Sequence, residues 1–213
     1  ERFVFEEAGG PEIFDIWHKA ARPGHGAAQT WHSSLPVALH SSTWCGDRAI
    51  SHLNNQNENE PFCSWISFPD PHHPFDCPTP WSTMYNLDDV DLPGEGKKDL
   101  DNRPWWHKAS LESEPNLADP QLKFFRAKLS RSVDQTEKQL REMTANYFGM
   151  ISLIDHNVGR IMLELKRLGL DKNTIIVYST DHGDLLGDHG LYLKGPTPYE
   201  GLLRVGLIVN GPG

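Results

Sequence analysis

The sequence predicts an α/β fold built in layers, with a mostly parallel central sheet. Apolar residues between Glu137 and Leu168 recur at three- and four-residue steps, as they do on the buried face of a long helix. A run of β-branched and aromatic residues, Ile175 to Tyr178, follows this helix and has the length of a strand. A helix that returns directly into an apolar strand is typical of layered α/β proteins. We therefore expect helices packed against a buried sheet.

Length, charge and cysteine content restrict the class of protein. The chain has 213 residues and a net charge of -9, which argues against broad nucleic-acid binding. No apolar run approaches the length that spans a membrane. The chain begins at Glu1 without an initiator Met and stops just after a strand-like run, so we expect an internal fragment. The odd number of cysteines, without metal-type spacing, favours a reducing compartment.

Further elements are expected on both sides of the long helix. Apolar residues near helical spacing predict a helix from Thr43 to Leu53. Phe62 to Phe68 is predicted to be a second buried strand, and Leu202 to Val209 a third. The loop-rich stretch 76–135 has room for two short helices, and we assign it to an excursion over the edge of the sheet that shapes a substrate pocket.

Polar residues follow the strand that ends at Tyr178. Ligands of open parallel sheets bind beyond the carboxyl ends of the strands, and here the chain continues into Asp181, His182 and Gly183. Adjacent side chains of a strand point to opposite faces, so Asp181 and His182 can share one ion only where the chain has left the strand. Gly183 permits that turn because it has no Cβ.

The predicted strand Phe62–Phe68 also leads into a polar loop. The loop reads Asp70-Pro71-His72-His73-Pro74-Phe75, and its prolines stop any regular element. Taken alone, this loop fits a proline-rich surface turn as well as it fits a loop that delivers histidines to a site.

The residues around Asp181 form a longer pattern. Residues 180–213 read TDHGDLLGDHGLYLKGPTPYEGLLRVGLIVNGPG, a run that resembles the sulfatase signature of the alkaline-phosphatase superfamily. The resemblance extends to residues 70–75, 147–149 and 155–159. It implies an alkaline-phosphatase-like layered α/β sandwich, incomplete in this fragment, with residues 1–213 forming part of one sulfatase-type catalytic domain.

The resemblance also assigns roles to individual residues. Asp181 and His182 match the pair that binds a divalent cation, for which the family favours calcium, with manganese, magnesium and zinc as alternatives. Lys194 matches the lysine that contacts the sulfuryl or phosphoryl oxygens. His72, as the first residue of an H-x-P triplet, matches the histidine that holds the leaving-group side, in preference to its neighbour His73.

These roles agree with the chemistry of ester hydrolysis. A metal ion neutralises charge on the oxygens of the transition state, and a lysine adds a compact cation. A histidine can donate a proton to the departing oxygen near neutral pH. His189 belongs to the same motif, and we expect it to be structural and to bond a loop carbonyl.

The nucleophile of the family does not stand in this sequence. Sulfatases use a formylglycine made from Cys or Ser in a C/S-x-P-x-R motif, and Cys45, Cys63 and Cys77 all fail that pattern. We expect the formylglycine and two further metal carboxylates upstream, and an inactive isolated chain. Gly206 stands where the family usually has proline, with a small expected effect.

The predicted function is metal-dependent hydrolysis of sulfate esters, with a small anionic ester as substrate. Hydrolysis of phosphonate or phosphate esters on the same scaffold is the alternative, and the His in the Asp181–His182 pair favours that branch. A noncatalytic metal-binding module is a second alternative. A calcium-binding repeat is disfavoured because Asp181 to Asp188 lacks alternating oxygen ligands. A homo-oligomer is compatible with all of these.

Overall fold

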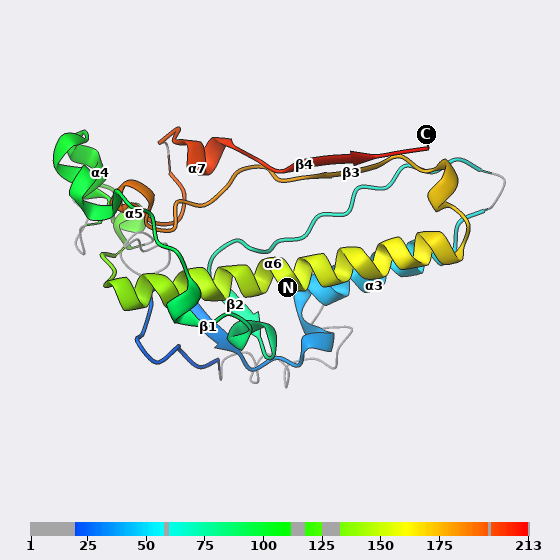
Figure 1. Ribbon diagram of the computed structural model, residues 1–213, viewed down its shortest axis with the longest axis horizontal. Helices are drawn as coiled ribbons and strands as arrows, with labels where there is room; N and C mark the ends of the chain where they lie inside the picture. Colours follow the sequence, from blue (N-terminus) through cyan, green and yellow to red (C-terminus); the bar gives the residue numbers. More distant parts are fainter. Residues whose placement is uncertain (1–19, 58–59, 112–117, 125–132, 196, 213) are drawn as a thin grey trace.

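One long helix, α6 (Glu137–Arg167), extends along the molecule (Figure 1). With 31 residues at about 1.5 Å each, α6 is roughly 46 Å long. The computed structural model describes residues 20–57, 60–111, 118–124, 133–195 and 197–212.

Local sequence explains where α6 begins and ends. Thr136 accepts a hydrogen bond from the backbone N–H of Gln139, whose side chain bonds back to the N–H of Thr136 as a capping box. At the other end Gly169 has a φ of 70°, which glycine adopts without steric cost. The N–H of Leu170 then reaches the carbonyl of Leu165 at 3.0 Å, which completes a Schellman motif. The expected long helix and its glycine cap are both confirmed.

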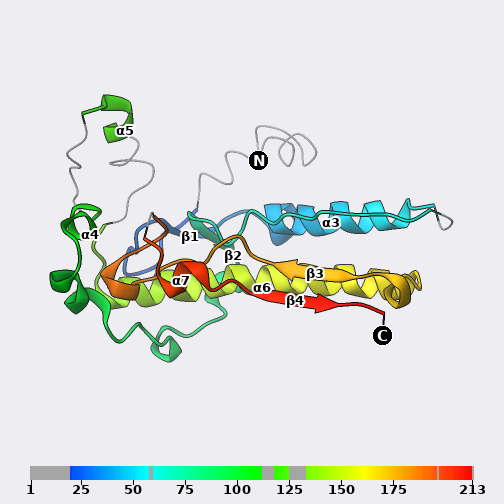
Figure 2. The same cartoon turned by 90° about the horizontal axis from the view of Figure 1, so that it is seen from above.

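The helix expected from Thr43 to Leu53 is also confirmed. It is α3 (Ser41–Asn54), and it lies along α6 (Figure 2). The apolar seam between the two helices contains Ala49, Leu53, Ile161 and Leu165. Full burial of one large aliphatic side chain contributes about 1.5–3 kcal/mol, so this seam is enough to hold the helix pair together.

A parallel sheet packs on the N-terminal half of α6. It consists of β1 (Thr30–Ser33) and β2 (Phe75–Pro78). The buried Asn146 of α6 donates one hydrogen bond to the carbonyl of Trp31 at 3.0 Å and another to the carbonyl of Phe75. One side chain therefore ties both strands to the helix.

The strand after α6 forms a second sheet. β3 (Ile176–Ser179) pairs with β4 (Leu207–Asn210) in antiparallel register. The prediction that this strand is buried on both faces is wrong within the described chain, because burial alternates and Val177 is 60% exposed. The α/β class with a parallel sheet is confirmed by β1 and β2, while β3 and β4 add an antiparallel pair.

The third predicted strand, Leu202–Val209, begins later than expected. Its first residues belong to the helical turn α7 (Glu200–Leu203), and the strand starts at Leu207. Leu202 is buried against Leu185 and Leu191 in the loop after β3. Tertiary packing of this leucine therefore sets the local conformation, and the apolar run alone did not reveal it.

The prediction of a strand over Phe62–Phe68 is wrong. The segment has no regular secondary structure and runs beside the α3–α6 pair, where Phe62 and Phe68 pack against the seam between the helices (Figure 1). Trp65, between them, is 93% exposed. A strand requires hydrogen bonds to a neighbouring strand, and no described residue pairs with this segment.

The loop-rich stretch 76–135 contains the two short helices that we expected. They are α4 (Trp105–Ala109) and α5 (Pro120–Phe124). The 3-10 helix η4 (Gly96–Asn102) precedes them and packs against η7 (Asp188–Gly190) in the loop after β3. This stretch therefore contacts the segment in which the sequence places its candidate residues.

The remaining described helices are single 3-10 turns between the larger elements. Their bounds are η1 (Val37–Leu39), η2 (Trp81–Thr83), η3 (Leu87–Asp89) and η6 (Asp171–Asn173). In the described parts of the chain, no helix combines the length and the apolar character that crossing a membrane requires.

Candidate functional site

Two candidate residues stand just beyond β3. The strand ends at Ser179, and Asp181 and His182 lie in the loop that follows. Their side chains converge, with Oδ2 of Asp181 3.5 Å from Nε2 of His182. The chain has left the strand before this pair, as the convergence of neighbouring side chains requires.

Gly183 serves this turn in a different way from the one expected. Its φ lies outside the left-handed region, so the backbone conformation itself does not require glycine. Instead, the N–H of Gly183 donates to the carbonyl of Leu202 at 2.9 Å. A Cβ on Gly183 would stand 1.9 Å from the carbonyl oxygen of Gly201. Glycine is needed here because the two backbones approach closely.

The contacts of His182 fix its tautomer. Its Nδ1 lies 2.8 Å from the carbonyl oxygen of Gly183, which can only accept, so Nδ1 carries the ring proton. Nε2 therefore keeps its lone pair and accepts a hydrogen bond from Nζ of Lys194 at 3.3 Å. A backbone carbonyl on one ring nitrogen is the usual support of a histidine whose other nitrogen binds a metal.

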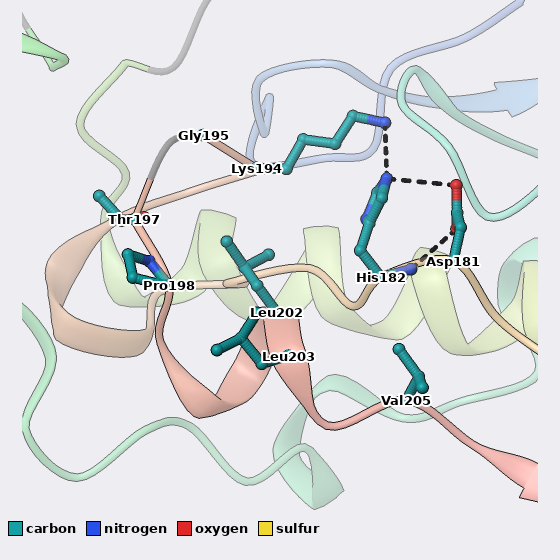
Figure 3. A pocket seen from close by; sticks show the side chains of 9 residues that line it. All are labelled: Asp181, His182, Lys194, Gly195, Thr197, Pro198, Leu202, Leu203 and Val205. Carbon is teal, nitrogen blue, oxygen red and sulfur yellow. Dashed lines mark hydrogen bonds and ion pairs between the residues drawn. The ribbon is translucent and has the colours of Figure 1, made fainter.

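Asp181, His182 and Lys194 line a pocket of about 660 Å³ (Figure 3). Lys194 and Asp181 both point toward the His182 ring. Small-molecule sites commonly have volumes of about 300–1,000 Å³, so the size suits a small ligand. The rest of the lining is largely apolar and follows Lys194 in the chain: Gly195, Thr197, Pro198, Leu202, Leu203 and Val205.

The two carboxylates near Lys194 differ in their ionisation. Slight burial opposes the shift, but the backbone N–H of His182 and the charge of Lys194 lower the pKa of Asp181. Burial raises the pKa of Asp184, although the N–H of Leu186 and the charge of Lys194 act in the opposite direction. Asp181 is therefore the more acidic carboxyl and offers its charge to the pocket.

The loop with His72 and His73 approaches Lys194 from a distant part of the chain. The two imidazole rings stack with centroids 4.3 Å apart, and Nδ1 of His72 bonds the carbonyl of His73. Burial, followed by the charges of His72 and Lys194, lowers the pKa of His73 to about 4. His72 is the more exposed of the two and does not line the pocket of Asp181. The structure thus joins three candidates in one pocket and sets His72 beside them.

A buried network that the sequence analysis missed holds the His72 loop. The hydroxyl of Ser42 donates to Oδ2 of Asp70, and Nδ1 of His40 accepts from the N–H of Ser42 at 3.4 Å. Nε2 of His40 lies 3.0 Å from the carbonyl oxygen of Asp76, beyond the loop. Burial raises the pKa of Asp70, and the hydrogen bond from Ser42 acts in the opposite direction. The His-Ser-Ser sequence at the start of α3, with His40 as the N-cap, was the available signal.

His189 bonds a carboxylate and not the loop carbonyl that we expected. Its Nδ1 lies 2.6 Å from Oδ2 of Asp99 in η4. Its ring also stacks on the ring of Tyr199, with centroids 4.0 Å apart. Sequence analysis could not find Asp99, because 90 residues separate it from His189.

Known proteins resemble the chain over most of its length. An arylsulfatase of Clostridium perfringens is 34% identical over 177 residues, which cover 82% of this chain and 33% of that relative. A multifunctional alkaline phosphatase superfamily protein of Trinickia caryophylli is 27% identical over 93% of this chain and 38% of the relative. The chain therefore spans well under half the length of either relative.

Solved structures identify the fold. A phosphonate monoester hydrolase from Silicibacter pomeroyi matches with a TM-score of 0.73 over 100% of this chain and 41% of that chain, at 21% identity. A phosphonate monoester hydrolase of Agrobacterium radiobacter matches with a TM-score of 0.68 over 99% of this chain and 40% of that chain, at 24% identity. The fold is alkaline-phosphatase-like, as the sequence resemblance implied. A family model described as Sulfatase matches residues 17–213, and on that match the chain belongs to the sulfatase family.

Proposed function

We propose that the full-length protein is a metal-dependent hydrolase of sulfate esters and that this chain contributes one side of its active site. The observation that carries the proposal is the convergence of a carboxylate, an imidazole and an ammonium in one pocket: Asp181, His182 and Lys194. An acid, a neutral donor ligand and a cation at one place suit a metal ion together with an anionic ester.

The donor set fits a divalent cation. Two bonds of about 2.1 Å to one ion can join atoms as far as about 4.2 Å apart, and Oδ2 of Asp181 lies 3.5 Å from Nε2 of His182. His182 has its lone pair on Nε2, which is the nitrogen that faces Asp181. A carboxylate alone suits calcium or magnesium, whereas the imidazole adds affinity for manganese or zinc. A bound ion would polarise the ester and neutralise charge on its oxygens.

Lys194 is the residue that we assign to the anionic group of the substrate. Its ammonium bonds Nε2 of His182, and a cation bound there would repel it toward another acceptor. A sulfate or phosphonate oxygen in the same pocket provides that acceptor. An ammonium aimed at the oxygens where charge develops stabilises the transition state more than the ground state.

His72 is the residue that we assign to the leaving group. Of the two histidines in its loop, His73 has a pKa of about 4, so its ring is neutral near pH 7 and is a poor general acid. His72 is the more exposed ring and is held by the carbonyl of His73. This arrangement supports His72 as the proton donor to the departing oxygen.

The whole of this chain, in our proposal, is part of one catalytic domain. The loop after β3 that carries Lys194 is called the lysine loop here. It shares a buried cluster with the parallel sheet, and this cluster includes Phe75, Met143 and Leu193. The excursion 76–135 is part of the same packed unit, because Leu100 packs against Leu185 of the lysine loop. A separate domain would bury a core of its own.

Hydrolysis of phosphonate esters is the second candidate. A phosphonate monoester and a sulfate ester are both singly charged tetrahedral anions, so the same lysine and metal can hold either. The histidine of the Asp181–His182 pair favours the phosphonate branch, as the sequence resemblance implied. A noncatalytic metal-binding role is the third candidate.

An ester panel distinguishes the three candidates. The full-length protein, loaded with metal, is assayed with an aryl sulfate and an aryl phosphonate, and the larger kcat/KM names the substrate class. Lys194→Ala should lower kcat by about 10²–10³-fold, the usual cost of one electrostatic donor. Lys172→Ala, at an exposed lysine of η6, is the matched control and should keep the wild-type rate. Metal binding without turnover of any ester would leave the noncatalytic role.

A further inference from the structure

A four-residue cluster joins the excursion to the loop of Lys194. Asp99 and Arg103 belong to the excursion, whereas His189 and Tyr199 belong to the loop. Nε of Arg103 donates to Oδ2 of Asp99 at 2.6 Å, and Nδ1 of His189 lies 2.6 Å from the same oxygen. The His189 ring stacks on Tyr199, and the Arg103 guanidinium lies 5.3 Å from the centroid of the Tyr199 ring. The contacts form a closed ring across the two segments.

Two residues of this cluster flank Lys194 in the sequence, so the cluster can restrict the position of the lysine. His189 stands five residues before Lys194 and Tyr199 five residues after it. Their stacked rings therefore close the loop that carries the lysine, at a centroid separation of 4.0 Å. A closed loop samples fewer conformations than an open one, which restricts where the ammonium can stand.

The chain between His189 and Lys194 transmits that restraint. Leu191, Tyr192 and Leu193 are all buried, with exposures of 4%, 4% and 3%. The N–H of Leu185 bonds the carbonyl of Leu193 at 2.9 Å, directly before the lysine. A buried and hydrogen-bonded segment of this kind resists local displacement, so a restraint on His189 also restrains Lys194.

The backbone of the loop needs such a restraint. His189 has a φ of 52° and Leu193 a φ of 62°, both in the left-handed region. Non-glycine residues adopt this conformation at a cost, and they keep it only where surrounding contacts enforce it. Asp99 and Tyr199 are the contacts that hold His189 in this conformation.

The same cluster could be taken for a metal site, because Glu95, Asp99 and His189 bring their ligand atoms within 4.8 Å of one another. However, Arg103 already donates to the Asp99 oxygen that such an ion would need. The Arg103 guanidinium would repel a divalent cation bound to that oxygen. The hydrogen bonds of Arg103 and His189 also lower the pKa of Asp99, as expected for a carboxylate that accepts from two donors.

We propose that Asp99 and His189 are positioning residues, which set Lys194 in the site through the contact between the excursion and the lysine loop. This inference rests on the proposed function for its effect on turnover. Its structural part, the ordering of the loop, stands independently of which ester is the substrate.

The test uses the full-length protein and a variant with a matched control. Asp99→Ala should lower kcat by about 10–100-fold with a smaller change in KM, because a misplacement near 1 Å can cost that much. Asp101→Ala is the control, since Asp101 lies on the same 3-10 helix but pairs with Lys108 at 2.6 Å. In a Lys194→Ala background, Asp99→Ala should cause no further loss. A loss of equal size in that background would mean general destabilisation and would overturn the proposal.

Hydrogen exchange provides the readout that does not depend on turnover. The amides of 185–193 should exchange faster in Asp99→Ala than in wild type or Asp101→Ala. Should Asp99→Ala fail to fold, His189→Asn replaces it, because asparagine tolerates a left-handed φ and is too short to reach Asp99. Unchanged exchange in the folded variant would overturn the proposal, whatever the activity. A wild-type protein that turns over no ester would instead refute the proposed function and leave the exchange result to decide.

Discussion

Replacing Gly183 with alanine should damage the site through space and not through backbone conformation. Its φ is compatible with alanine, but the added Cβ would lie 1.9 Å from the carbonyl oxygen of Gly201. Carbon and oxygen atoms in close contact stand about 3.3 Å apart, so the two backbones must separate by about 1.4 Å. The hydrogen bond from Gly183 to Leu202 cannot survive that separation.

The displacement would reach the proposed metal ligands directly. The carbonyl of Gly183 holds Nδ1 of His182, and a shift of the carbonyl turns the ring away from Asp181 and Lys194. A misplacement of about 1 Å can reduce a rate by about 10²-fold, and overpacking of this kind costs about 1–3 kcal/mol of stability. We expect both effects in Gly183→Ala of the full-length protein.

Gly195→Ala is the matched control for this experiment. Gly195 follows Lys194 in the same pocket, and a Cβ there would meet no atom within 4 Å. Ester turnover, metal affinity by titration calorimetry and unfolding by denaturant are measured for both variants. Equal turnover and equal metal affinity in Gly183→Ala and Gly195→Ala would refute the argument from close approach.

Three further predictions test the metal, the His73 loop and the fold. His182→Ala should weaken metal binding strongly in titration calorimetry, with the exposed His52→Ala as control. The metal affinity of the wild type should decrease as the pH is lowered, because protonation of His182 removes the lone pair that would bind the ion. Because the pKa of His73 falls from 6.5 to about 4 on folding, the unfolded chain binds the proton first. Stability should therefore drop as pH is lowered from 6.5 toward 4, and His73→Gln should flatten that drop in denaturant titrations. Asn146→Ala should cost about 2 kcal/mol of unfolding free energy, because the buried carbonyl of Phe75 and the partly buried carbonyl of Trp31 lose a donor.

The helices were predictable because their signals are local. The stripe of apolar residues in α6 repeats within the helix, and Thr136, Gln139 and Gly169 stand at its two ends. Strands need a partner that an apolar run does not specify. Phe62–Phe68 has the composition of a strand but pairs with no strand among the described residues. Leu202 lies in the helical turn α7 and not in a strand, because its side chain packs against other buried leucines.

The candidate site divides in the same way. Asp181, His182 and Lys194 lie within one short segment, so a sequence motif could bring them to attention together. Asp99 is 90 residues from His189, and Ser42 is 28 residues from Asp70. Contacts over such separations depend on the fold, and a single sequence gives no sign of them. The supports of the site were therefore found only in the structure.

These supports explain how two distant loops keep their places relative to each other. Near its start, α6 meets the lysine loop, since Leu140 fills the space beside Gly187. Six residues further on, Asn146 holds the carbonyl of Phe75, which ends the His72 loop. Six helical residues at about 1.5 Å each put roughly 9 Å between these two contacts. Because a helix does not stretch, α6 sets the spacing between the His72 loop and the lysine loop, while Ser42 and Asp99 set the orientation of each loop.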